Sequence, residues 1–218
     1  MAKLVWDQAG ERFYETGTRK AVLFPTKEDN TYGEGVAWNG ITAVSESPEG
    51  ADNNDFYADD IKYASIRSAE TFGATIEAYT YPPEFMECDG SASPVPGVYL
   101  GQQGRKAFGF SYVTQIGNDL TNEAGYKIHL IYGCTASPSE RSYQTINDSP
   151  DAISFSWDID STPVNVTGHK AVSSVTIDST KVDKTKLAAF EDILYGNGET
   201  PSRLPLPDEV ITLLTAGA

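Results

Sequence analysis

The sequence contains few of the side chains that build disulfide or metal centres: two cysteines and two histidines among 218 residues. Cys88 and Cys134 are far apart and form no CxxC motif, and His129 and His169 are isolated. These spacings exclude a disulfide framework and the usual zinc-ligand patterns. A single disulfide between the two cysteines stays open, but two buried free thiols are the expected arrangement. His129 is expected on a sheet surface and His169 in a turn.

Positive charge is also scarce. Lys and Arg number 16 against 31 Asp and Glu, which gives a formal net charge of -15. Phosphate binding depends on Lys and Arg side chains that displace counterions, so this composition argues against a protein that wraps nucleic acid. An acidic surface is compatible with DNA only as a repelling wall.

Long apolar runs are absent as well. No stretch of 18 consecutive apolar residues occurs, so we expect no membrane span and no membrane partner. Residues 1–13 lack the apolar core of a signal peptide, which predicts synthesis in a cytoplasm. The hydrophobic content of 39% and the aromatic content of 11% nevertheless suffice for a substantial buried core.

What the sequence does contain is a series of short segments typical of β-strands. They are residues 20–24, 40–50, 72–81, 106–116, 125–133, 152–162 and 170–178. The turn-forming stretch 117–124 predicts a hairpin between the fourth and the fifth of them. We therefore predict a mainly β fold, a sandwich or barrel, with one flanking α-helix at about 183–195.

The predicted helix has an apolar face formed by Leu187, Phe190 and Leu194, with Asp183 as N-cap. Residues 1–198 are expected to form the β domain, which includes a long acidic loop at 46–60. Residues 199–218 are expected to be a C-terminal extension or arm: a Pro-rich linker followed by a short apolar strand, "EVITLL", that pairs within the chain or with a neighbour.

Tests for catalytic and cofactor motifs fail. The acidic loop departs from the EF-hand pattern, because Phe56 occupies the fifth position when Asp52 is counted as the first, and no Gly follows. The stretch 101–106, "GQQGRK", lacks Walker spacing and is typical of a turn. No G-x-S-x-G motif occurs, and with so many carboxylates any acid–base pair would be arbitrary. We expect no enzymatic activity, no cofactor and no metal.

Several segments resemble a known family when they are taken in order: residues 38–64, 72–85, 99–119, 125–134 and 147–164. Together they look like the major tail protein, the tail-tube subunit, of long non-contractile-tailed phages of Gram-positive bacteria. The resemblance extends over about residues 4–194. It rests on the order and general composition of these segments, because no single motif is diagnostic.

The resemblance implies a structural virion protein that assembles into stacked rings, most often hexameric, around a negatively charged channel for DNA ejection. Implied partners are other copies of the chain and the tape-measure, tail-terminator and distal tail proteins, with DNA passing through unbound. The implied location is the virion tail. The alternative is a carbohydrate-binding β-sandwich of a virion or cell surface, with a stacking platform made by Tyr79, Tyr81, Phe155 and Trp157.

Charge segregation suggests where copies would meet. Residues 28–61 hold nine carboxylates and no Lys or Arg, whereas basic residues gather at 3–27, 105–127 and 170–186. We expect the acidic loop of one copy to face basic residues of another, in preference to lining the channel. The predicted contact residues are Glu46, Glu49, Asp52, Asp55, Asp59, Asp60, Arg105 and Lys106.

Overall fold

A computed structural model describes residues 4–146, 148 and 151–215 of the chain. Residues 1–3 of the predicted β domain and residues 216–218 of the predicted C-terminal arm lie outside the described residues. Three positions of segment 147–164, one of those that carry the family resemblance, also lie outside them. The strands are β1 (Tyr14–Pro25), β2 (Val36–Trp38), β3 (Ile41–Gly50), β4 (Asn53–Ala58), β5 (Ile61–Arg67), β6 (Glu70–Ala78), β7 (Ala92–Val95), β8 (Val98–Leu100), β9 (Phe108–Gly117), β10 (Gly125–Ala136), β11 (Phe155–Ser161) and β12 (Ser174–Asp178). The helices are α1 (Phe85–Cys88), α2 (Lys184–Tyr195) and α3 (Pro207–Thr215).

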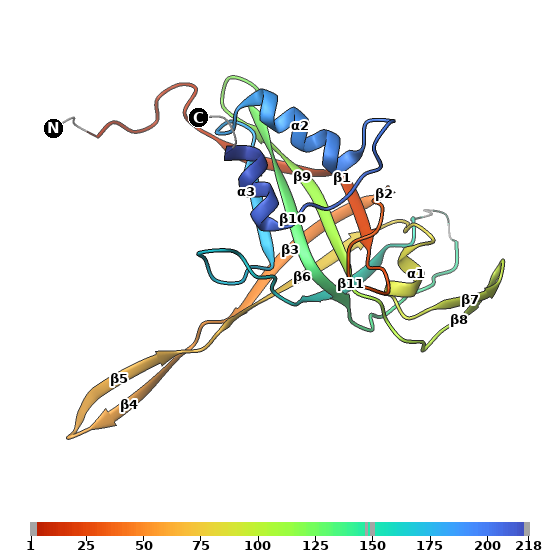
Figure 1. Ribbon diagram of the computed structural model, residues 1–218, viewed down its shortest axis with the longest axis horizontal. Coiled ribbons are helices and arrows are strands. Elements are labelled where there is room, and N and C mark those ends of the chain that lie inside the picture. Colours follow the sequence, from red (N-terminus) through yellow and green to blue (C-terminus); the bar gives the residue numbers. More distant parts are fainter. Residues whose placement is uncertain (1–3, 147, 149–150, 216–218) are drawn as a thin grey trace.

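The main sheet is antiparallel and bends into two packed layers. Its strand order is β2-β1-β9-β10-β11-β6-β3, and β12 pairs with β10. One layer consists of β2, β1, β9, most of β10 and β12; the other consists of β11, β6 and β3 (Figure 1). The described strands do not close into a barrel. The expected β-sandwich with a flanking helix is confirmed, as is the hairpin, which joins β9 to β10.

The bend occurs in β10 at Gly133. Before this residue β10 pairs with β12, and after it β10 pairs with β11. Gly133 has a φ of 59°, and a Cβ there would lie 2.3 Å from the carbonyl oxygen of Thr162. Its own N–H donates to the hydroxyl of Tyr32 at 2.8 Å. Only glycine fits this conformation and this close approach, so the residue fixes the place where the sheet changes layer.

Aromatic side chains fill the space between the two layers. Trp157 of β11 is 1% exposed and packs edge-on against Trp38 and Phe85, with ring centroids at 5.5 Å and 5.1 Å. Strand alternation places Trp157 and Ile159 on the buried face of β11. Because the rings meet mostly edge to face, their packing adds to the gain from burial.

A second apolar core lies on the opposite face of the β1–β9–β10 layer, under α2 and α3 (Figure 1). Leu187, Phe190 and Leu194 of α2 are buried there, as predicted. The Asp183 carboxylate accepts from the backbone N–H groups of Thr185 and Lys186, which confirms the N-cap.

The prediction of an apolar strand at 209–214 is wrong, because this segment belongs to α3. Pro207 opens the helix, Asp208 and Glu209 lie in its first turn, and Val210 is buried in the second core. Proline at the first helical position and acids in the first turn both favour a helix, and they outweigh the β-branched residues of a short apolar run. The C-terminal segment thus packs on its own chain.

The docking of α3 is expected to weaken in acid. Hydrogen bonds from the backbone N–H and hydroxyl of Thr167 lower the pKa of Asp208, and a hydrogen bond from Arg203 lowers the pKa of Glu209. A lowered folded-state pKa gives stability that is present above the unfolded value, about 4, and is lost as pH falls through the folded value. Amide exchange protection in α3 should therefore drop between pH 6 and pH 3, and should drop less in Asp208→Asn/Glu209→Gln.

The amides of α2 serve as the internal control for that measurement. Beyond its first turn, which Asp183 caps, this helix is predicted to keep its protection, because the buried Leu187, Phe190 and Leu194 do not titrate. Equal loss of protection in both helices would contradict the assignment to Asp208 and Glu209.

Candidate assembly surfaces

The predicted acidic loop at 46–60 is wrong as a loop, because these residues form parts of two strands and a hairpin tip. Residues 46–50 belong to β3, and β4 pairs with β5 beyond them. Neither face of this segment is buried, so apolar and polar residues do not alternate along it, and the sequence lacks the usual pattern of a strand. The turn that joins β4 to β5 consists of Asp59 and Asp60, with φ of 51° and 61°, the two positive values that a type I′ hairpin turn requires.

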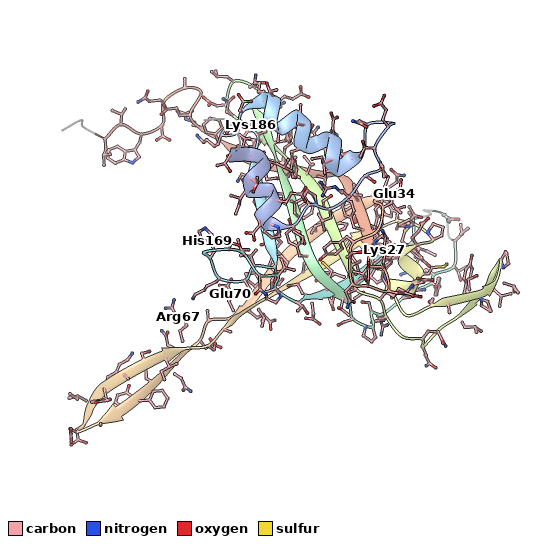
Figure 2. The ribbon with its side chains drawn as sticks, in the orientation of Figure 1. Lys27, Glu34, Arg67, Glu70, His169 and Lys186 are labelled. Atoms are coloured by element: carbon pink, nitrogen blue, oxygen red, sulfur yellow. The ribbon has the colours of Figure 1, made fainter. Side chains whose placement is uncertain are left out.

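Residues 52–68, called the ribbon below, extend the β3–β6 pair far out from the body of the protein (Figure 1). The ladder continues across the junction, because the N–H of Ser68 donates to the carbonyl oxygen of Asp52 at 2.9 Å. Arg67 and Glu70 mark this junction in Figure 2. The ribbon is therefore a two-stranded arm with two solvent-exposed faces.

The two faces of the ribbon differ in chemistry. On one face Lys62 pairs with Asp55 at 2.8 Å, and Ser65 donates to Asp55 at 2.6 Å; these hydrogen bonds lower the pKa of Asp55. The register places Phe56, Ile61 and Ile66 together on the other face, where they are 47%, 63% and 61% exposed. Exposed large apolar side chains gathered on one face of an arm are characteristic of a contact surface.

The predicted contact residues do not meet within one chain. Glu46 and Glu49 lie on β3, and Asp52, Asp55, Asp59 and Asp60 lie on the ribbon. Arg105 and Lys106 instead lie beside α1. Lys106 pairs with Glu87 at 2.6 Å, which raises the Lys106 pKa, and Arg105 donates to the backbone oxygen of Asp89 at 3.3 Å.

Glu46 is tied to the body. It accepts a hydrogen bond of 2.8 Å from the hydroxyl of Tyr112, whose ring stacks on His129 at 4.5 Å. Thr114 lies 2.9 Å from Nε2 of the same imidazole. Burial lowers the pKa of His129, which is half-buried rather than freely exposed on the sheet. This cluster fastens β3, and thereby the base of the ribbon, to the other layer.

The outer face of the β3–β6–β11 layer is polar and acidic. The register places small hydroxyl side chains and four carboxylates on it: Ser45, Ser47, Glu49, Thr71, Thr75, Glu77, Ser156, Asp158 and Asp160. These three strands contain no Lys or Arg. A shallow hollow of about 350 Å³ lies between β3, β6 and β11, and Thr75 donates to Asp158 across it at 2.9 Å. This surface, called the acidic face below, carries uncompensated negative charge.

Sequence reasoning missed the hairpin formed by β7 and β8. The hairpin projects on the side of the body away from the ribbon (Figure 1). Val95, Val98, Tyr99 and Leu100 are between 47% and 58% exposed. Residues 90–104 contain no charged side chain, and this feature of the sequence could have marked the hairpin as a contact element.

The thiols, the possible metal ligands and the aromatic side chains do not form a small-molecule site in the described part of the chain. Cys88 and Cys134 are buried free thiols, as expected, and burial raises the pKa of Cys88 to about 12. No group of three or more His, Cys, Asp or Glu side chains in the described part of the chain could hold a metal ion. Trp157 is buried and Tyr81 and Phe155 pack against the core, so Tyr79 alone of the proposed stacking platform is well exposed.

A depression of about 760 Å³ lies between the β1 end and α1 and is lined by Lys27, Glu34 and Lys106 among others; Lys27 and Glu34 are labelled in Figure 2. Acidic and basic side chains are mixed there, and nothing selects a ligand class. No helix within the described residues has the length and apolar character needed to cross a membrane. When the sequence is compared with known proteins, no family model and no curated protein matches it.

Proposed function

We propose that the chain is the tail-tube subunit of a long-tailed phage, a structural protein that assembles with other copies into stacked rings. The observation that carries this proposal is the acidic face, because it is a broad sheet surface of hydroxyls and carboxylates without a single Lys or Arg. The family resemblance described above supports the same conclusion.

In this proposal the acidic face lines the channel. DNA carries a dense array of phosphates, and a wall that offers no cation gives those phosphates nothing to bind. Glu49, Glu77, Asp158 and Asp160 repel the backbone, and the short Ser and Thr side chains leave a smooth surface. Passage of DNA then needs no specific contact, no cofactor and no catalysis.

The protruding elements support self-assembly. The ribbon and the β7–β8 hairpin both expose apolar side chains that one chain cannot cover. Open edges at β2 and β3 are available for pairing between copies. The tape-measure, tail-terminator and distal tail proteins are the further partners proposed, and the virion tail is the proposed location.

Electron microscopy of concentrated, negatively stained protein tests the proposal. Rings or tubes about 100 Å wide are expected if six domains surround a duplex-sized channel, since a domain of this size has a radius of gyration near 17 Å. A chain that stays monomeric at every concentration and salt condition would overturn the proposal. Binding of the monomer to a glycan array would favour the carbohydrate-binding alternative instead.

A further inference from the structure

We propose that the apolar face of the ribbon packs on the β7–β8 hairpin of a second copy of the chain, with Asp59 and Asp60 at the ribbon tip reaching Arg105 of that copy. This inference rests on the proposed self-assembly and specifies which two surfaces meet.

The placement of the two elements makes the contact intermolecular. The ribbon and the β7–β8 hairpin project at opposite ends of the longest dimension of the molecule (Figure 1). A ribbon therefore cannot fold back on the hairpin of its own chain. Each copy presents one ribbon at one end and one hairpin at the other, which is the arrangement of a head-to-tail contact between identical subunits.

The chemistry of the two surfaces matches. Phe56, Ile61 and Ile66 offer an apolar face, and Val98 and Leu100 belong to a hairpin with no charge between residues 90 and 104. Packing them together removes exposed apolar surface from water on both sides without burying an ion. If the surface that packs on the ribbon were charged, its charged groups would lose their hydration against these apolar side chains, which costs free energy.

The ribbon is long enough to span the hairpin. At about 3.3 Å per residue, the six residues of β4 span roughly 20 Å and the four of β7 roughly 13 Å. When a ribbon points towards the body of a neighbour and that neighbour's hairpin points back, the ribbon tip lies near the base of the hairpin.

Charge completes the match at that base. Arg105 follows the hairpin, and its guanidinium contacts a backbone oxygen, that of Asp89. Among the described residues no ion pair includes Arg105. The tip residues Asp59 and Asp60 likewise form no ion pair there, so the contact brings together opposite charges that are uncompensated in one chain.

Two variants, each with one of the two surfaces disrupted, test the contact. Ile66→Glu places a charge on the apolar face of the ribbon, and Val98→Glu places one on the hairpin; both positions are exposed, so each monomer should fold normally by circular dichroism. Each variant alone is expected to lose assembly at least tenfold in sedimentation. An equimolar mixture is expected to associate more than either variant alone, because one partner keeps an intact ribbon and the other keeps an intact hairpin.

Controls separate this contact from the wider proposal. Tyr57→Glu, on the other face of the ribbon, should assemble like the unaltered chain. Arg105→Asp should weaken assembly, and so should Asp59→Asn/Asp60→Asn, which removes the charge and keeps residues that suit the positive φ of the turn. If the unaltered chain forms tubes while Ile66→Glu and Val98→Glu also do, the proposed contact is wrong and the tube function stands. If the unaltered chain never associates, both are overturned.

Discussion

Replacement of Gly133 by alanine is expected to destabilise the folded chain by about 2–5 kcal/mol, from left-handed backbone strain of about 1–2 kcal/mol and overpacking of about 1–3 kcal/mol. The structural reason is the backbone of Gly133, which has φ of 59° and leaves no room for a Cβ beside Thr162. Because β10 exchanges β12 for β11 at this residue, the strain acts where the two layers are joined.

Urea denaturation of the monomer, followed by tryptophan fluorescence, measures this loss, since Trp38 and Trp157 are buried between the layers. Gly168→Ala is the matched control. Gly168 has a similar φ of 76°, but no atom lies within 4 Å of the position that a Cβ would occupy there, so only the backbone strain of about 1–2 kcal/mol remains. Equal losses in the two variants would contradict the role assigned to the close approach at Gly133.

The second large effect is expected on the acidic face. Ser47→Lys/Thr75→Lys/Ser156→Lys would place three cations per copy on the surface proposed to line the channel. Phosphates gain partners and release counterions, so tubes of this variant should retain about tenfold more short duplex DNA at about 50 mM salt, with most of the gain lost by about 200 mM. Co-sedimentation of labelled DNA with tubes measures the difference.

The size-matched control replaces the same three residues with glutamine, which adds bulk without charge. It should retain as little DNA as the unaltered tubes. DNA retention that is unchanged in the lysine variant, in tubes that form normally, would show that this face does not line the channel.

Strand β11 could be predicted because burial of one face gives it a strong alternation. Trp157 and Ile159 face the core while Asp158 and Asp160 face water, so the sequence between 155 and 161 shows its period directly. The helix α2 was predictable for the same reason, since Leu187, Phe190 and Leu194 lie on one buried face.

The ribbon and α3 were less accessible to sequence reasoning for physical reasons. Neither face of the ribbon is buried, so acidic residues are tolerated on a strand and resemble a loop in the sequence. The run "EVITLL" is too short for its period to separate strand from helix, and the decisive signals are Pro207 and the acids that follow it.

The acidic face depends on long-range pairing. Thr75 and Asp158 are 83 positions apart, and they become neighbours only because β6 pairs with β11 in one particular register. A shift of one residue would turn these side chains inward and expose Trp157, so the register set by the buried aromatic residues also determines the charge of the opposite face. Composition revealed the excess of acid but could not place it.

The attachment of the ribbon to the β3–β6 pair has a mechanical consequence. A pull on the tip along the strand direction draws β3 and β6 the same way, because the hairpin joins both strands, so the hydrogen bonds between this pair and its neighbour β11 are loaded in shear. Strand β6 is also held on its other side by β11, from Phe155 to Asp160. An arm anchored in this way transmits tension directly into the sandwich.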